Sequence, residues 1–207
     1  MNFILMLSRI TSYKEDNEFN MIYTEDQIYP FFAPDDSHGF LSNWYKSDFR
    51  GVARFSGYDE YKIANVTEYC YPITYVCAEQ FLMASKATLF RDLAAHEKIM
   101  LTNSPREMKD FGRRVKNFNS AVWDANKMSI MRMGLYYKFT QNEELQRGLL
   151  LTGDKVLIEA SPYDHIWGVG LGPNDTRLLN TDEWRGQNLL GQCLMGIRKA
   201  IQNGSKN

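Results

Sequence analysis

The sequence is poor in the residues that build metal sites and disulfide frameworks. It contains three cysteines, Cys70, Cys77 and Cys193, an odd number without close spacing. Such a set argues against a disulfide scaffold and for a reducing compartment, so we expect a cytoplasmic location. The three histidines lie far apart in the chain, and no Cys-x2-Cys or His-x3-His spacing occurs. The sequence therefore predicts no metal site.

Long apolar runs and an excess of one charge are also missing. No stretch approaches the ~20 apolar residues of a membrane-spanning helix, and the apolar residues 1–7 lack the basic flank of a signal peptide. The charges nearly cancel, since 24 Lys and Arg face 25 Asp and Glu. A chain without a basic excess has no electrostatic footprint for broad nucleic-acid binding. We expect neither a membrane nor an obligate protein partner.

Several common catalytic motifs are absent. There is no Gly-x-Ser-x-Gly elbow and no P-loop, and the glycines at 168, 170 and 172 do not form a dinucleotide-binding fingerprint. Carboxylates, a lysine, amides and aromatic residues remain. This inventory suits cleavage of an N-glycosidic bond, in which a carboxylate stabilises an oxocarbenium-like centre and stacking holds an aromatic leaving group. It suits a nucleotide-binding module equally well.

The order of patterns predicts an α+β fold, mainly helical, in a single domain with a small strand-rich N-terminal portion. A chain of 207 residues suits one domain. We expect residues 1–20 to be an N-terminal tail or extension and residues 21–207 to form the domain. From residue 78 onward the hydrophobic period becomes helical. It predicts helices at 78–92, from 105, at 120–139, at 143–151 and at 186–201.

Strands are expected mainly in the first third of the chain. Short apolar runs at 21–23 and 28–32 and a β-branched, aromatic stretch at 53–77 are typical of strands, as is the run at 156–160. A helix start is clearest at Ser104, which can cap the helix while Pro105 takes its first position. Glu107 stands where it would complete a capping box.

The first candidate site is the pair Glu79 and Lys86. A spacing of seven places both on one helix face, ~10.5 Å apart along the axis, with Met83 between them. An acid and an amine flanking an apolar side chain can hold one small ligand from both ends. The alternative is a pair of solvated charges on an exposed helix.

The second candidate is the loop that follows the strand expected at 156–160. Glu159 ends this strand, Asp164 follows in the loop, and Trp167 is followed by Gly168. Rigid strands often present reactive groups at such junctions, and glycine lets the backbone approach a ligand closely. The alternative is a tight turn around one packed tryptophan.

Two weaker candidates complete the set. Asn43 and Trp44 place an amide beside aromatic rings in an early loop, which suits recognition of a heterocyclic base, although loop aromatics also fill cores. The basic residues 113–116 can contact a phosphate, or they form a solvated helix end whose charge complements the helix dipole.

The order of motifs along the chain resembles the NADAR (YbiA-like) family. The resemblance runs from about residue 31 to 201 and is carried by the segments GFLSNWY (39–45), AEQFLMASKA (78–87), the helix of Trp123 leading to KFTQN (138–142), 149–171 and GQNLLGQCLMGIR (186–198). It implies an α+β, mainly helical fold without a metal or other cofactor. It also implies an N-glycosidase of riboflavin-pathway intermediates or an enzyme that removes ADP-ribose from guanine.

The resemblance also assigns residues. It implies catalytic roles for Glu79, Lys86 and Asp164. The substrate-binding residues that we expect are Asn43, Trp44, Met83, Trp123, Glu159, Trp167, Gly168 and Asn188. Lys86 has two possible roles: it binds phosphate or ribose oxygens, or its amine attacks C1 of the ribose to give an imine.

The sequence departs from the family pattern at two places, of which the first weakens a role for that position and the second bears on substrate choice. Gln80 stands where many relatives carry histidine, and a strand-rich insertion is expected around 49–77. The expected substrate is a ribosylated base or ADP-ribosylated guanine, free or in nucleic acid. The alternatives are a non-catalytic binding module for NAD or ADP-ribose and a protein whose aromatic residues serve only its core and interfaces.

Overall fold

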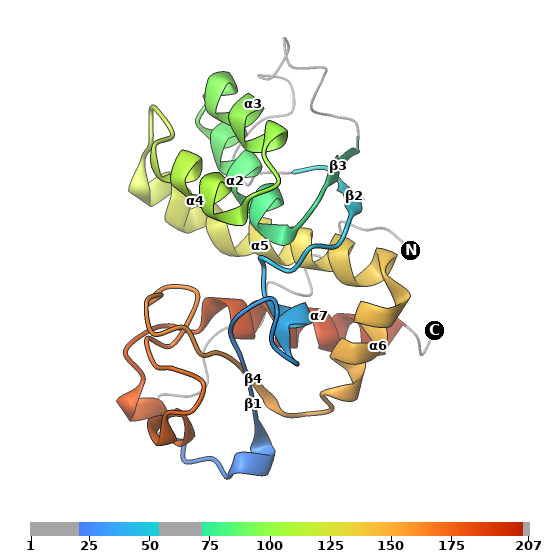
Figure 1. Ribbon diagram of the computed structural model, residues 1–207, viewed down its shortest axis with the longest axis vertical. Coiled ribbons are helices and arrows are strands. Elements are labelled where there is room, and N and C mark those ends of the chain that lie inside the picture. Colours follow the sequence, from blue (N-terminus) through green and yellow to red (C-terminus); the bar gives the residue numbers. More distant parts are fainter. Residues whose placement is uncertain (1–20, 54–71, 205–207) are drawn as a thin grey trace. The chain divides into compact units, whose positions relative to one another are not determined.

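A computed structural model describes residues 21–53 and 72–204 (Figure 1). The expected tail at 1–20 and the middle of the strand-rich insertion, 54–71, lie outside the described residues. The fold is α+β and mainly helical, as expected. The chain divides into two compact units, one continuous and one assembled from two segments. Unit 2 comprises Asn43–Asn142, and unit 1 comprises the residues before and after it.

Unit 2 is built around the helix α2 (Ala78–Leu89). Ten of its twelve residues are buried, which is the pattern of a helix covered on all sides rather than of a surface helix. Three helices pack against it or beside it (Figure 1). They are α3 (Leu93–Leu101), α4 (Pro105–Arg113) and α5 (Ser120–Gln141).

Side-chain caps fix where these helices begin. Ser104 Oγ accepts the Glu107 N–H at 3.4 Å, so the predicted start of α4 is confirmed. The predicted capping box is wrong, because Thr102 intervenes. The Thr102 hydroxyl donates to the Glu107 carboxylate, and its oxygen accepts the Ser104 N–H at 3.1 Å. The helix α3 was not expected, although Asp92 caps it through the Ala95 N–H at 3.1 Å.

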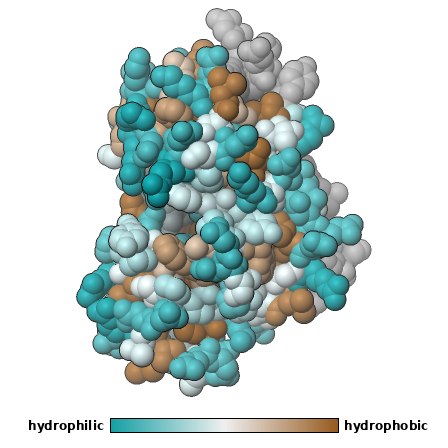
Figure 2. Space-filling model, in the orientation of Figure 1, coloured by the Kyte–Doolittle hydropathy of each residue, from teal (hydrophilic) through white to brown (hydrophobic). Residues whose placement is uncertain are grey.

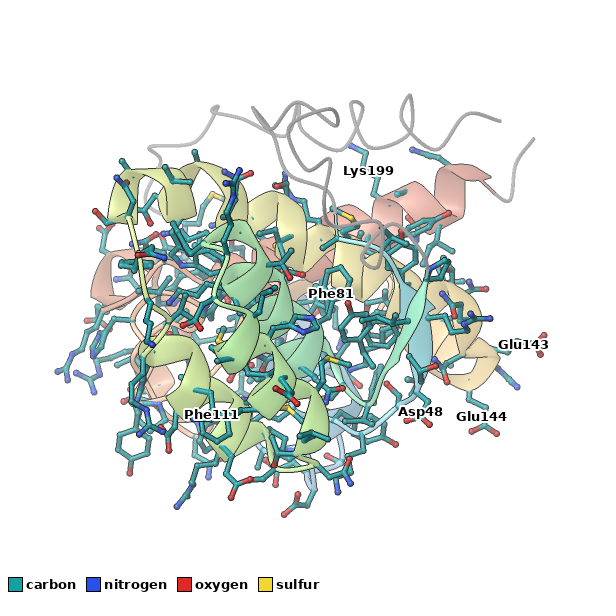
Figure 3. The ribbon with its side chains drawn as sticks, turned by 90° about the horizontal axis from the view of Figure 1, so that it is seen from above. Asp48, Phe81, Phe111, Glu143, Glu144 and Lys199 are labelled. Atoms are coloured by element: carbon teal, nitrogen blue, oxygen red, sulfur yellow. The ribbon has the colours of Figure 1, made fainter. Side chains whose placement is uncertain are left out.

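A two-stranded antiparallel sheet packs on the helices of unit 2. It pairs β2 (Phe49–Gly51) with β3 (Ile73–Tyr75). β3 lies within the stretch 53–77 where strands were expected, and β2 lies just before it. Tyr75 and Phe81 meet edge to face, with ring centroids 4.9 Å apart. Figure 3 shows Phe81 in the interior, with Asp48 near the edge. Aromatic burial of this kind stabilises the sheet against α2.

Unit 1 joins β1 (Ile28–Phe31) to β4 (Val156–Glu159) as a parallel pair. Its other helices are α6 (Glu143–Leu151) and α7 (Leu189–Gly204), and α7 packs on β4. Short 3-10 helices occur at Glu25–Gln27, Gly39–Leu41, Thr176–Leu179 and Thr181–Glu183. Ile28, Ile158, Val169 and Leu178 belong to its buried core.

Two expectations for unit 1 need correction. The run at 21–23 forms no strand but only an isolated bridge between Ile22 and Asn180. The last helix begins at Leu189 rather than at 186, because Asn188 adopts a positive φ of 51° that a helix cannot include. The strand at 156–160 is confirmed, one residue shorter than expected.

The described surface carries mixed polarity. Figure 2 shows hydrophobic residues scattered among polar ones on the displayed face, and Figure 3 shows Glu143 and Glu144 pointing outward from the start of α6. Within residues 21–53 and 72–204, none of the helices has the length and apolar character needed to cross a bilayer.

Candidate active site

Glu79 is a buried carboxylate in the first turn of α2. It is 2% exposed, because α2 forms the centre of unit 2. The Asn43 amide donates from Nδ2 to Glu79 Oε2 at 2.5 Å, and the Glu79 N–H donates to the Asn43 carbonyl at 2.9 Å. The two residues are therefore locked together by reciprocal bonds. The positive end of the helix dipole adds a field that favours the ionised carboxylate.

Lys86 lies two turns further along α2 and is half-buried. Its Nζ atom is 4.4 Å from the ring centroid of Phe118 and 5.2 Å from that of Trp123. Burial lowers the pKa of the amine, and the charge of Glu79 partly opposes this by raising it. A lysine whose pKa is lowered carries more of the neutral, nucleophilic amine near neutral pH than an exposed lysine does.

Gln80 and Met83 belong to the framework around this pair. The Gln80 side chain accepts the Val76 N–H at 2.9 Å and donates to the carbonyl oxygens of Ile99 and Thr102 at 3.1 and 3.3 Å. Both ends of its amide therefore bind backbone groups. The Met83 thioether packs on Gly112 of α4, where an added Cβ would come within 2.0 Å of the sulfur. A side chain at position 112 would displace the Met83 thioether, so Gly112 allows this close helix contact.

The remaining predicted residues of unit 2 are more accessible. Trp44 and Trp123 are half-buried. The basic cluster at the end of α4 is mostly exposed, and Arg113 forms a loose ion pair with Asp110 at 3.8 Å. An exposed pair of this kind contributes little to stability. This matches the solvated helix end that the sequence allowed.

Asp164 shapes the loop of unit 1. Its Oδ1 atom accepts the N–H groups of Ile166 and Trp167 at 3.0 and 2.8 Å, a turn that aspartate favours. Trp167 is half-buried beside it. A Cβ at Gly168 would meet the carbonyl oxygens of Glu159 and Asp164 at 2.8 and 2.9 Å. Glycine therefore allows the loop to approach the end of β4 closely, and the Val169 N–H donates to the Glu159 carbonyl there at 3.0 Å.

Asn188 connects the loop to β4, because its N–H donates to the Gly168 carbonyl at 3.0 Å while its side chain binds the strand. Its Oδ1 accepts the Glu159 N–H at 3.0 Å, and its Nδ2 donates to the Leu157 carbonyl at 2.9 Å. The side chain is 2% exposed. Both polar ends of the amide are thus engaged by backbone, which gives Asn188 a structural role besides the binding role that remains a prediction.

Replacing Asn188 by glycine is expected to lower the free energy of unfolding by about 2–4 kcal/mol, because two buried backbone groups lose their partner. Asn188→Ala should cost about 1 kcal/mol more, since alanine tolerates the positive φ less well than glycine does. Urea unfolding of the two variants and the wild type measures both effects. Losses below about 0.5 kcal/mol in both variants, within the usual range for surface changes, would contradict the structural role.

The structure groups the predicted residues by unit. In unit 2, the Asn43 amide donates a hydrogen bond to the Glu79 carboxylate. The charge of Glu79 raises the pKa of Lys86, whose Nζ lies over the Trp123 ring. In unit 1, the contacts described above connect Glu159, Asp164, Trp167, Gly168 and Asn188. Among the residues that the structure describes, no three His, Cys, Asp or Glu side chains cluster as metal ligands do.

Lys138 is a buried lysine that was not among the predicted site residues. It is fully buried in α5, with Nζ 5.3 Å from the ring centroid of Tyr45 and 5.1 Å from that of Phe139. Burial lowers the pKa of its amine to about 7, and Cys77 opposes this slightly. A sequence signal was present, because Lys138 continues the helical spacing of the buried Met131 and Leu135.

Lys138→Met is expected to abolish a rise in stability between pH 7 and 9. The pKa of Lys138 is about 7 in the folded chain against 10.5 for an ordinary lysine. The unfolded state therefore binds more protons in this window, so wild-type stability rises with pH, by about 2 kcal/mol. Above pH 9 Cys77, whose pKa burial raises to about 11, acts in the opposite direction.

Urea unfolding at pH 7 and pH 9 tests this prediction for the wild type and Lys138→Met. Lys98→Met, at an exposed position of α3, is the matched control and should keep the wild-type difference. An equal pH difference in the wild type and Lys138→Met would show that the amine is not the titrating group.

The comparisons with known proteins agree with the sequence patterns. The NADAR domain family matches residues 30–202. N-glycosidase R617 of Acanthamoeba polyphaga mimivirus is 46% identical over 128 residues, which are 62% of this chain and 75% of that protein. Riboflavin biosynthesis protein VVA0006 of Vibrio vulnificus is 29% identical over 178 residues, 86% of this chain and 39% of that protein.

A solved structure shares the fold. The NMR structure of the E. coli protein YbiA has a TM-score of 0.64 and 24% identity, covering 90% of this chain and 92% of that one. The expected enzyme class is confirmed by several curated relatives that carry the name N-glycosidase. With the family match spanning most of its length, the chain belongs to the NADAR domain family.

Proposed function

We propose that this N-glycosidase hydrolyses the bond between C1 of a ribosyl group, carried as ribose phosphate or ADP-ribose, and the nitrogen of a base or amine. Two substrates fit this chemistry. One is ADP-ribosylated guanine, free or within a nucleic acid, and the other is a ribosylamino intermediate of riboflavin synthesis. The names of the relatives, N-glycosidase and riboflavin biosynthesis protein, support the reaction class and the second substrate.

The observation that carries the proposal is the arrangement on α2. The buried carboxylate of Glu79 is fixed by Asn43, and a half-buried amine follows two turns later at Lys86. Cleavage of an N-glycosidic bond develops positive charge at C1. A carboxylate held in a poorly solvated place stabilises that charge more than one in water does.

Two routes satisfy the chemistry. In the direct route a water oxygen bonds to C1 as the C1–N bond breaks, and the proton from water goes to the departing nitrogen. Glu79 then stabilises the charge at C1 or activates the water. In the covalent route the neutral amine of Lys86 bonds to C1 as the C1–N bond breaks, and one amine proton goes to the departing nitrogen. The second amine proton goes to the ring oxygen as the ribose ring opens, which leaves an imine between C1 and Lys86. Water hydrolyses the imine and returns the amine.

The remaining residues take supporting roles in the proposal. Asp164 is assigned as the second carboxylate, and its support is a preorganised turn in which one oxygen already accepts two N–H groups. Asn43 is assigned as a reader of the base or ribose. The side chains assigned to stacking and substrate contact are Trp44, Met83, Trp123, Glu159, Trp167, Gly168 and Asn188.

We also propose that residues 21–207 act as one catalytic domain. The family match, which runs through both units from residue 30 to 202, supports this. A cytoplasmic location is proposed for the enzyme. Cys77 and Cys193, which are buried thiols outside any disulfide, are consistent with such a compartment.

A turnover assay read by mass spectrometry tests the proposal. One substrate is an oligonucleotide carrying ADP-ribosylated guanine, and the other is a ribosylaminopyrimidine phosphate. Release of ADP-ribose from the first identifies an enzyme that removes ADP-ribose, and release of ribose phosphate from the second alone identifies a metabolite hydrolase. A folded protein that acts on neither but is stabilised by ADP-ribose would instead be a non-catalytic binding module.

A further inference from the structure

Phe118 is an exposed aromatic residue that the proposed reaction does not use. It lies in the turn between α4 and α5, and 47% of its surface is exposed. Its ring centroid is nevertheless 4.4 Å from Nζ of Lys86. Trp123, near the start of α5, lies 5.2 Å from the same atom. Two rings from one stretch of chain therefore flank the amine.

Hydrogen bonds hold the turn that carries Phe118 at several points. The Lys116 N–H donates to Asp92 Oδ2 at 2.8 Å, and the Asn117 amide donates to the Phe90 carbonyl at 3.4 Å. Asn119 caps α5 through the Val122 N–H at 3.1 Å. These bonds fix the backbone on both sides of residue 118.

The ring itself has a second support. It meets Phe90 edge to face, with centroids 5.2 Å apart. Asn117 has a positive φ of 56°, a conformation that asparagine tolerates better than most residues do. An exposed phenylalanine is thus held beside Lys86 by a defined turn.

The rings of Phe118 and Trp123 restrict the conformations that the Lys86 side chain can adopt. A lysine side chain in water samples many rotamers, and restricting it beforehand lowers the entropy lost when it engages a ligand. The negative faces of the rings attract the ammonium form, while their bulk excludes water from the amine. Within the described residues, the charge that acts on Lys86 is that of Glu79 on the same helix, whereas α5 and the turn before it contribute rings.

We propose that Phe118 is a positioning residue for Lys86, whose ring holds the amine ready to engage the ribosyl group of the substrate. The inference rests on the role proposed for Lys86 and deepens it. It requires an aromatic ring at position 118. Tyrosine should therefore replace phenylalanine, whereas leucine, which is apolar but has no ring, should not.

The first experiment needs no substrate. The full chain is methylated with formaldehyde and cyanoborohydride over a pH series, and peptide mass spectrometry gives the pH midpoint at which Lys86 becomes reactive. In Phe118→Ala water reaches the amine, so the midpoint should rise. In Phe118→Leu the apolar cover remains but the attraction for the ammonium is lost, so the midpoint should fall.

The controls lie in the same unit. Lys98, which is exposed, is the internal reference for reagent and pH, and Leu101→Ala removes a side chain that is 78% exposed at the end of α3. Neither the Lys98 midpoint nor that of Lys86 in Leu101→Ala should move. An unchanged Lys86 midpoint in both Phe118 variants would overturn the inference.

The second experiment uses whichever of the two assay substrates is turned over. Phe118→Leu is expected to lower kcat by about tenfold with little change in KM, and Phe118→Tyr should restore kcat. Equal losses in the leucine and tyrosine variants would indicate a merely structural role and overturn the inference.

Lys86→Ala distinguishes a failure of the role proposed for Lys86 from a failure of the role proposed for Phe118. If this variant keeps the wild-type rate, the role proposed for Lys86 fails, whatever Phe118 does. If Lys86→Ala loses activity while Phe118→Leu keeps it, only the inference about Phe118 fails. Thermal unfolding of each variant confirms that the compared proteins are folded.

Discussion

Glu79→Gln is expected to lower kcat by about a thousandfold while KM changes little, because the substitution removes the charge but keeps the shape of the side chain. The amide oxygen of glutamine can still accept the hydrogen bond that Asn43 donates to Oε2. The fold should therefore persist. The loss then reports the negative charge that stabilises C1 in the transition state.

Mass spectrometry of the released ribosyl product measures this effect on the substrate that the wild type turns over. Glu97→Gln is the matched control, because it makes the same change at an exposed position of α3 in the same unit. The control should keep the wild-type rate. A Glu79→Gln variant whose kcat stays within about threefold of wild type would remove the carboxylate from the mechanism.

Lys86→Ala is expected to lower kcat/KM by about a hundredfold or more, and Lys86→Arg distinguishes the two possible reasons. Arginine keeps the positive charge but cannot form the imine. If the amine is covalent, both variants lose kcat, and borohydride traps an adduct on the wild type alone. If the amine binds phosphate, arginine keeps most of kcat, and alanine raises KM.

The pH dependence of turnover distinguishes the two roles of Lys86 independently of the variants. Burial lowers the pKa of Lys86, so a covalent route should gain rate as the pH rises through that lowered pKa. A phosphate-binding ammonium should lose affinity over the same range. Lys98→Ala, which alters an exposed lysine of α3, should affect neither profile. Wild-type turnover that continues unchanged in Lys86→Ala would exclude both roles.

Much of this architecture could be predicted from local patterns. Ser104 and Pro105 located the start of α4, and helical spacing placed Glu79 and Lys86 on one helix. The burial of Glu79 could not be predicted in this way. It depends on helices packed around α2 and on Asn43, which lies far away in the sequence. A local pattern cannot distinguish a solvated charge from one covered by distant chain.

The contacts of Phe118 and Asn188 could not be predicted for the same reason, because they involve residues distant in the sequence. Phe118 lies in a loop without hydrophobic periodicity, and it lies beside Lys86 because its neighbours Lys116 and Asn117 donate hydrogen bonds to distant parts of the chain. Asn188 was expected at the start of a helix, but its amide satisfies backbone groups of β4 instead. Lys138 is the exception, since its spacing from buried neighbours was visible, and only its charge argued against a core position.

The pairing of β1 with β4 bears on how the chain folds during synthesis. β1 leaves the ribosome early, but its partner is added only after the whole of unit 2 has been made. Unit 2 is continuous and rich in local helical contacts, so it can fold first. Once folded, it shortens the flexible loop that must close to join the two strands, and this lowers the entropic cost of closure.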